Sequence, residues 1–257
     1  MGSLLFCATT VVADQEFDHS KWDYLLSRFV QDGRVDYKSL ASNRDLLDGY
    51  LRELETFSVS ALSELGREER IAFWVNLYHA SVIRIILDDY PVASIEEIPA
   101  VYETRTIRAI GDYFSLIELR DHVLRRGFRD ERVLVALVSG RMDSPRLLGE
   151  AFRGDRLDEQ LDRVSQIFVD DGRSNRIIVG ERKIYVSPLF QDFGSDFILN
   201  FGSLDPPSYL SEAEASVIGF ILHHSRDPAK RLFLNTGRYQ LAYLPRDARL
   251  NDISNIQ

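Results

Sequence analysis

Two polar side chains, Asn76 and His79, stand in the most apolar stretch of the chain. They are three residues apart, so a helix would place both on one face. An imidazole can transfer a proton or hold a ligand, and a carboxamide can donate and accept hydrogen bonds. If both are buried, each needs a partner, because an unsatisfied buried polar group costs about 1–3 kcal/mol. His79 is therefore either bonded to a nearby backbone carbonyl or used for a ligand or a proton.

The residues around this pair predict a buried central helix. From Ile71 to Leu87 the chain is apolar on nearly every side, with four polar exceptions. Such a helix is enclosed by a larger fold or spans a membrane. Seventeen residues with a central arginine make a poor membrane span. Charged residues precede the stretch and Pro91 limits it, so we expect it to form the centre of the core.

Other patterns predict the elements that surround this helix. Apolar residues at helical spacing and capping residues predict helices, and turn signals between short alternating runs predict a hairpin. The predicted helices cover residues 17–30, 43–57, 115–126 (ended by Gly127), 157–169 and 211–223, and the predicted hairpin covers 175–186. The apolar run 132–139 is interpreted as a buried strand, although periodicity alone also allows a helix. It leads into a polar loop, 140–145.

No repeat and no linker divides the chain. Residues 14–257 are therefore expected to form a single α+β domain, in which flanking helices and a small, mostly antiparallel sheet surround the buried central helix. A chain of 257 residues is long enough to bury such a core.

Charge and cysteine content exclude several classes of protein. The net charge of −9 argues against binding to nucleic acid and to anionic membrane surfaces. A single cysteine, Cys7, allows no intrachain disulfide and no cysteine-rich zinc site. His223 and His224 are adjacent and cannot bind one ion as an i, i+4 pair would. We expect no metal and no cofactor.

The first residues resemble an export signal. The apolar run from Leu4 to Ala13 ends in small residues, as a signal peptidase site does, although no lysine or arginine precedes it. Residues 1–13 are thus a possible signal or export segment, and the protein is expected to be periplasmic or secreted, or otherwise cytoplasmic. Without that segment we expect no integral membrane segment.

Several blocks of sequence, in order, are similar to those of a known family. Residues 72–80 (AFWVNLYHA) are similar to its hallmark helix A-F-W-I-N-x-Y-N-A, and residues 32–37 (DGRVDY) to its signature D-G-x-V-D-Y. Later blocks extend the similarity over roughly residues 17–252. The chain resembles the bacterial and plant family called domain of unknown function 547. This resemblance implies a shared fold and little about activity, because the family's role is largely unassigned.

The chain departs from the family pattern where chemistry is expected. His79 replaces a second asparagine of the hallmark helix. Arg120-Asp121 replaces Glu-His, with His122 one position later. The family loop C-x-x-x-x-C-P has Ser139 and Ser144 in place of its cysteines.

Three hypotheses of function follow. The one we favour is a non-catalytic binding or scaffold protein that recognises a peptide, a glycan or a protein partner through a cleft beside the central helix. Asn76, Tyr78, His79 and Arg141 are its candidate ligand-binding residues. A protein–protein interaction module is another alternative, and it requires an exposed apolar patch.

The remaining alternative is a hydrolase of a cysteine-hydrolase-like fold, so that an enzymatic activity stays open. Ser139 or Ser144 would be the nucleophile and His79 or His122 the base. Asp121 or Asp143 would orient that base. No G-x-S-x-G motif supports this hypothesis.

A cluster of arginines between Arg125 and Arg132 stands out in an acidic protein. It is either a solvated helix end or a site for an anion or an acidic partner.

Overall fold

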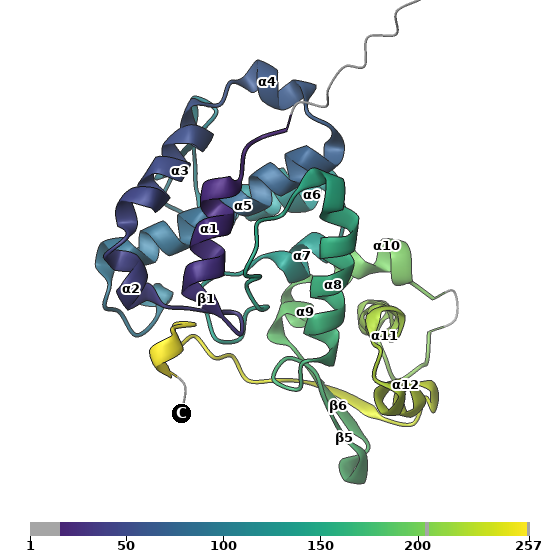
Figure 1. Ribbon diagram of the computed structural model, residues 1–257. Coiled ribbons are helices and arrows are strands. Elements are labelled where there is room, and N and C mark those ends of the chain that lie inside the picture. The colour runs from purple at the N-terminus through teal and green to yellow at the C-terminus, as the bar shows by residue number, and fades with distance from the viewer. Residues whose placement is uncertain (1–15, 204–205, 256–257) are drawn as a thin grey trace, which may run out of the picture.

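The computed structural model describes residues 16–203 and 206–255 (Figure 1). The predicted export segment at residues 1–13 lies outside them. The α-helices are α1 (Ser20–Phe29), α2 (Tyr37–Ala41), α3 (Arg44–Thr56), α4 (Val59–Glu64), α5 (Arg67–Asp89), α6 (Arg126–Phe128), α7 (Arg132–Ala136), α8 (Leu157–Asp170), α9 (Pro188–Phe193), α10 (Ile198–Phe201), α11 (Glu212–His224) and α12 (Pro228–Asn235). A π-helix, η2 (Glu118–Arg125), precedes α6, and short 3-10 turns are η1 (Ile95–Glu97), η3 (Gly154–Arg156), η4 (Val179–Glu181), η5 (Gly194–Phe197) and η6 (Ile253–Asn255).

Within residues 16–203 and 206–255 the strands are short and form three small sheets. They are β1 (Val30–Gln31), β2 (Arg34–Val35), β3 (Ile107–Ala109), β4 (Asp112–Phe114), β5 (Arg176–Ile178), β6 (Lys183–Val186) and β7 (Gln240–Tyr243). β1 pairs with β2, β3 with β4, and β5 with β6, each in antiparallel fashion. β7 runs parallel to β6, with Ile184 opposite Leu241. The predicted α+β class is confirmed.

The central helix is α5. Every residue from Ile71 to Ile83 is buried, and α3, α8 and η2 pack against the helix. Its length and hydropathy would suit a membrane span, but 83% of its most apolar window is buried inside the protein, as in the core helix of a globular fold. The first hydrophobic cluster forms around it, and within that cluster Trp22 stacks on Tyr50 with ring centroids 5.7 Å apart.

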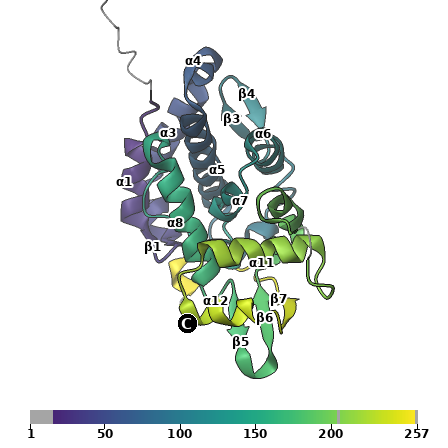
Figure 2. The ribbon, with the colours of Figure 1, turned by 90° about the vertical axis from the view of Figure 1, so that its right-hand side faces the viewer.

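A second hydrophobic cluster is formed by residues of the C-terminal half of the chain, between Leu134 and Tyr239. The rings of Phe190, Phe197 and Phe220 pack edge to face there, with centroids 4.8–6.1 Å apart. In Figure 2, α11 runs crosswise, with α12 and the sheet β5-β6-β7 below it. Leu134 and Val135 of α7 belong to this cluster, whereas Val133 and Ala136 of the same helix belong to the first. The short helix α7 therefore joins the two cores.

The structure corrects two details of the predicted elements. Residues 132–136 form the helix α7 and not a strand. The apolar side chains of this helix are buried in both hydrophobic clusters. In such a fully buried segment the β-branched residues do not determine whether a strand or a helix forms. Leu137 then takes an extended conformation. The helix predicted to end at Gly127 continues to Phe128, and Arg129 follows in the left-handed region with φ 55°.

The C-terminal segment, residues 244–252, crosses the molecule in extended form and bonds to separate parts of it. The Leu250 amide donates to the Ala93 carbonyl at 2.8 Å, and the Asn251 amide to the Gly140 carbonyl at 2.9 Å. The Met142 amide donates to the Arg249 carbonyl at 2.8 Å. This segment therefore fixes the loop that follows α7.

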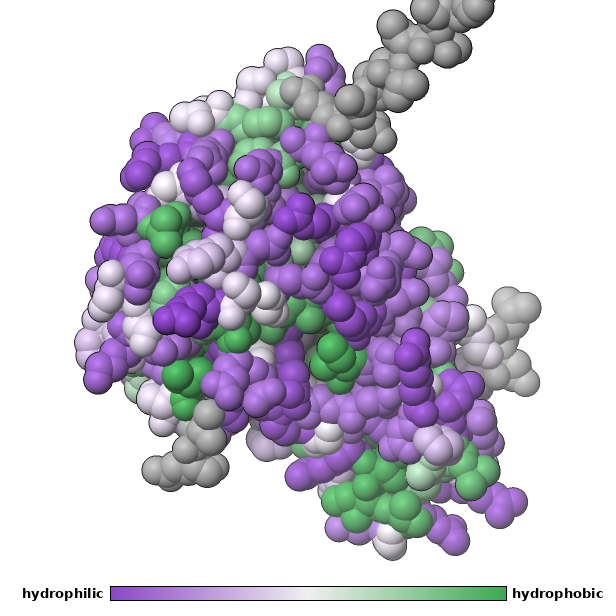
Figure 3. Space-filling model, viewed as in Figure 1, coloured by the Kyte–Doolittle hydropathy of each residue, from purple (hydrophilic) through white to green (hydrophobic). Residues whose placement is uncertain are grey.

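The surface in Figure 3 is mostly hydrophilic, and apolar side chains gather over the hairpin of β5 and β6. Val179, at the turn of this hairpin, is 69% exposed. An interaction module would use such a surface.

Asn76 is fully buried, and its side chain forms hydrogen bonds with the backbone of another segment. Its Nδ2 donates to the Phe152 carbonyl at 2.8 Å, and its Oδ1 accepts from the Phe152 amide at 3.0 Å. Gln160 of α8 holds the neighbouring residues in the same way, since it bonds the Ala151 carbonyl and the Arg153 amide. Segment 151–153 thus crosses the core with its polar groups satisfied.

Replacement of Asn76 by leucine should lower the free energy of unfolding by at least about 2 kcal/mol. The side chain keeps its size, but the amide and the carbonyl of Phe152 lose their partners inside the core, and each unsatisfied buried group costs about 1–3 kcal/mol. Urea denaturation followed by tryptophan fluorescence measures the change. The control is Asn43→Leu, which removes one exposed side-chain bond to Ser39. An equal loss in both variants would contradict the assignment.

Candidate functional site

A cleft of about 320 Å³ lies beside the central helix. Its walls come from α5, η1, the helix that contains η2, α7 with the loop after it, α9 and the C-terminal segment. Its apolar lining consists of Ile117, Leu134, Leu137, Pro145, Pro188, Leu189 and Phe193, and its polar lining of Tyr78, Glu96, Tyr102, Arg120, Ser139, Arg141, Asp143, Ser144, Asp192 and Arg246. An apolar concavity with a few convergent polar groups is the usual form of a ligand site.

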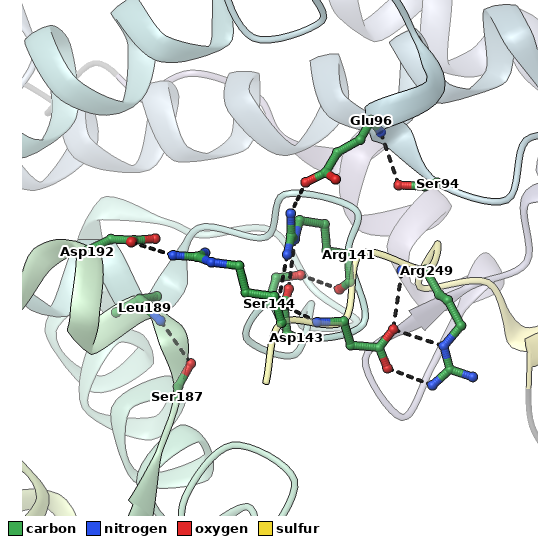
Figure 4. Close-up of polar contacts among 11 residues, drawn as sticks. Ser94, Glu96, Arg141, Asp143, Ser144, Ser187, Leu189, Asp192 and Arg249 are labelled. Atoms are coloured by element: carbon green, nitrogen blue, oxygen red, sulfur yellow. Dashed lines mark hydrogen bonds and ion pairs between the residues drawn. The ribbon is translucent and has the colours of Figure 1, made fainter. Parts of the chain in front are cut away.

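The loop 139–145 is held in one shape by its own side chains and by α5. Gly140 has φ +81°, and a Cβ at this position would lie 2.6 Å from Cδ1 of Ile86, so any other residue would strain the backbone and displace the Ile86 side chain. Arg141 donates through Nε and Nη2 to the two oxygens of Asp143, both at 2.8 Å, and through Nη1 to Glu96 (Figure 4). Asp143 also accepts from the Asp247 amide at 2.8 Å. The loop is thus a fixed wall of the cleft.

The π-helix η2 places two arginines against one aromatic ring. The guanidinium carbons of Arg120 and Arg125 lie 5.2 and 5.1 Å from the ring centroid of Phe193. In an α-helix, residues five apart point about 140° away from each other. The i→i+5 bonding of a π-helix brings them closer to one face. The irregular helix therefore allows both cations to contact Phe193, and only Arg120 lines the cleft.

Asp121 fixes the position of Arg120. Arg120 donates through Nε and Nη2 to both oxygens of Asp121 at 2.8 Å. Burial alone would raise the pKa of Asp121, but the hydrogen bonds and charge of Arg120, with Arg125 nearby, outweigh it and keep that pKa below its usual value. Asp121 stays ionised and does not line the cleft itself.

Two tyrosines contribute neutral hydroxyl groups. Tyr78 of α5 is 2% exposed and Tyr102 is half-buried. Burial is the main cause that raises the pKa of both phenols, and near Tyr102 the charge of Arg141 opposes it. Both groups are therefore protonated at neutral pH and are able to donate a hydrogen bond to a ligand.

His79 faces the backbone and not the cleft. Its Nε2 lies 3.1 Å from the Ala136 carbonyl oxygen and 3.2 Å from the Val138 amide nitrogen. The neutral ring accepts from Val138 when its proton is on Nδ1 and donates to Ala136 when it is on Nε2. Burial lowers the pKa of His79 to about 4. The ring instead borders a small separate cavity of about 10 Å³, together with Tyr37 and Asn251.

The structure brings together some of the residues predicted from the sequence. Tyr78, Ser139, Arg141, Asp143 and Ser144 all line the cleft. The other candidates lie elsewhere, with Asn76 and His79 bonded to backbone groups, Asp121 bonded to Arg120 and His122 exposed on η2.

The geometry around the two serines bears on nucleophilic chemistry. Ser144 donates through Oγ to the Arg141 carbonyl at 2.5 Å. Within residues 16–203 and 206–255, neither Ser139 nor Ser144 has a hydrogen bond to an imidazole. Over the same residues, no group of three or more His, Cys, Asp or Glu side chains is placed to hold a metal ion.

Several residues of the cleft were not singled out from the sequence. Tyr102, Asp192 and Glu96 come from parts of the chain that only the tertiary fold brings together. Arg120 was noted as a departure from the family pattern. The sequence did not indicate that Arg120 lines the cleft, whereas His122, two residues later, does not.

The fold and the cleft define a mostly helical α+β protein with a cleft lined by arginines, tyrosines and apolar side chains. Residues 62–169 match the family model described as "Protein of unknown function, DUF547". This match supports membership of the chain in that family, as the sequence blocks indicated, and it covers α5, η2, α7 and the loop 139–145. Neither a curated protein nor a solved structure matches the chain.

Replacement of His79 by glutamine should reduce the sensitivity of the fold to acid. The pKa of His79 is about 4 in the folded state and 6.5 as the reference value. Between these values the unfolded state binds more protons, so the free energy of unfolding falls as the pH drops from about 6.5 to 4. His79 should account for up to about 3 kcal/mol of that fall.

Urea denaturation at pH 7 and at pH 4.5 measures this effect. Burial also lowers the pKa of His19 and His224 to about 4, so both add to the fall in the wild type and in the variant alike. The exposed His122→Gln variant is the control. The same pH dependence in wild type and His79→Gln would contradict the assigned burial of the ring.

Proposed function

We propose that the protein is a non-catalytic binding protein whose cleft takes a short peptide with an apolar side chain. The observation that carries this proposal is the composition of the cleft, in which apolar walls meet polar donors whose capacity is partly unused. Arg120 bonds Asp121 through Nε and Nη2, and Arg246 bonds Asp192 through Nη2 at 2.5 Å. Nη1 of each arginine has no hydrogen bond to a described residue.

A peptide suits these groups because it carries both kinds of partner. Its backbone carbonyls or its terminal carboxylate accept hydrogen bonds from guanidinium and phenol donors. An apolar side chain of the peptide would pack against Leu137 and Leu189. The cleft volume of about 320 Å³ is near the lower end of the range for ligand sites and suits a few residues of extended chain.

The charges inside the cleft are balanced by internal ion pairs. Arg141 is bonded to Asp143 and Glu96, and Arg246 to Asp192. A ligand with a high negative charge would have to compete with these carboxylates. A ligand that uses single hydrogen bonds, as a peptide does, leaves the pairs intact.

A glycan is a weaker candidate for this cleft. Sugars are usually held against the open face of an aromatic ring. Tyr78 is buried, and the Phe193 ring is already in contact with the guanidinium groups of Arg120 and Arg125.

Selection from a library of displayed peptides tests the proposal. Peptides that bind the protein should share a motif with an apolar residue, and Leu189→Trp should weaken the selected peptides by more than about tenfold, because the indole fills the cleft. Isothermal titration calorimetry measures the affinities. Leu232→Trp is the matched control, since Leu232 is 73% exposed on α12, and it should change the affinity by less than about twofold. A library without enriched peptides, or peptides that bind Leu189→Trp as tightly as wild type, would contradict the proposal.

The hydrolase hypothesis makes a different prediction. A serine without a positioned base is a weak nucleophile, and Ser144 is bonded within its own loop. We therefore expect a fluorophosphonate probe to leave the protein unlabelled, as measured by intact-protein mass spectrometry. Labelling that Ser139→Ala or Ser144→Ala abolishes would show a nucleophilic serine and would overturn the non-catalytic proposal.

A further inference from the structure

A second pocket, of about 360 Å³, lies where η2 continues into α6. Three arginines line it: Arg125, Arg126 and Arg129. It is separate from the peptide cleft, with Leu134 as the lining residue that both share. Nothing in the proposed function uses this pocket.

The local backbone explains why the arginines converge. Arg125 ends the π-helix and Arg126 begins α6, so both stand in the last turns of one continuous helix. Arg129 follows in the left-handed conformation, with φ 55° and ψ 41°, a position at which glycine is the usual residue. Cations are favourable near a helix C-terminus, which accounts for their presence there. It does not account for a pocket lined by three of them.

The acidic groups of the pocket leave two of these cations uncompensated. Asp196 accepts from Nε of Arg125 at 2.7 Å, and Asp130 is bonded by Arg132 through Nε and Nη2 at 3.0 and 2.9 Å. Arg126 and Arg129 are exposed and form no ion pair with any residue in the described ranges.

One carboxylate in the pocket opposes an anion. Glu131 is 8% exposed, and its Oε2 accepts a hydrogen bond from the side-chain amide of Asn200 at 2.7 Å. The Glu131 carboxylate lines the same pocket as Arg126 and Arg129 and has no ion pair with a described residue. The charged lining is therefore balanced, with three arginines and three carboxylates. Because Arg125 holds Asp196 and Arg132 holds Asp130, Glu131 is the one lining carboxylate without an ion pair to a described residue, and two exposed guanidinium groups keep their N–H donors free.

We propose that this pocket binds a small molecule with a phosphate group. Guanidinium groups bind phosphate oxygens through paired N–H donors, and Arg126 and Arg129 have theirs free. The volume exceeds that of a phosphate ion, and Leu134 and Leu199 supply an apolar wall for an organic part of the ligand. Leu199 is 76% exposed.

Phenyl phosphate is the probe, with inorganic phosphate and phenol as the two halves of its structure. Titration at constant ionic strength, followed by calorimetry or by NMR, should show saturable binding of phenyl phosphate that is tighter than that of either half. Phenol bound as tightly as phenyl phosphate would overturn the proposal, because the pocket would then recognise the ring alone.

Variants with opposite expected effects locate the site. The double variant Arg126→Gln/Arg129→Gln should weaken phenyl phosphate by at least about tenfold, since it removes the charged donors. Glu131→Gln keeps an acceptor for Asn200 and removes the opposing charge, so it should tighten binding several-fold. Neither variant touches Arg125, which contacts Phe193 next to the cleft.

The matched control is Arg182→Gln/Arg238→Gln. Both of these arginines are exposed and form no ion pair with a described residue, and Arg182 also has a left-handed backbone, with φ 51°. The control removes the same charge and should change the affinity by less than about twofold. An equal loss in the control, or no tightening in Glu131→Gln, would overturn the proposal. Saturable binding of a polyglutamate peptide without any binding of phenyl phosphate would overturn it in favour of an acidic partner. Melting temperatures show whether each variant is folded.

Discussion

The fold depends on how a buried apolar helix satisfies its few polar groups. Asn76 lies at the centre of α5, where no solvent reaches, and its carboxamide pairs with both backbone groups of Phe152. His79, one turn later, meets the backbone at Ala136 and Val138. Because a buried polar group without a partner is costly, these two side chains oblige two distant segments to lie against the same helix.

The cleft follows from this constraint. With Val138 fixed against α5, the loop that begins at Ser139 must turn away sharply, and Gly140 provides the turn where a side chain would meet Ile86. The C-terminal segment then bonds the loop from its other side through the backbone of Arg249 and Asn251. The wall of the cleft is rigid because its supports come from the core. Arg141 is bonded through all three of its nitrogens, whereas Nη1 of Arg120 and Nη1 of Arg246 have no hydrogen bond to a described residue.

The sequence predicted the parts of this arrangement that local pattern controls. A long apolar stretch with helical ends predicted α5, and the spacing of Asn76 and His79 predicted a shared face. The same spacing did not reveal that both side chains bond backbone groups, because their partners are 57 to 76 residues away in the chain. The segment predicted as a strand at 132–139 is a helix over residues 132–136. The sequence could not distinguish the two, because a segment that is buried on all sides has no apolar periodicity. Arg120 reaches the cleft through a π-helix, a geometry that residue patterns do not encode, and Arg246 reaches it through the path of the C-terminal segment.

Hydrogen exchange of individual backbone amides tests the central claim most directly. If α5 holds the two segments as described, the amides of Phe152 and Val138 exchange only when the whole protein unfolds, with a free energy of opening equal to that of global unfolding. Exposed Gly149, three residues before Phe152, should exchange many orders of magnitude faster. Exchange of Phe152 and Val138 at the rate of Gly149 would contradict the account, since the polar side chains of the central helix would then hold nothing in place.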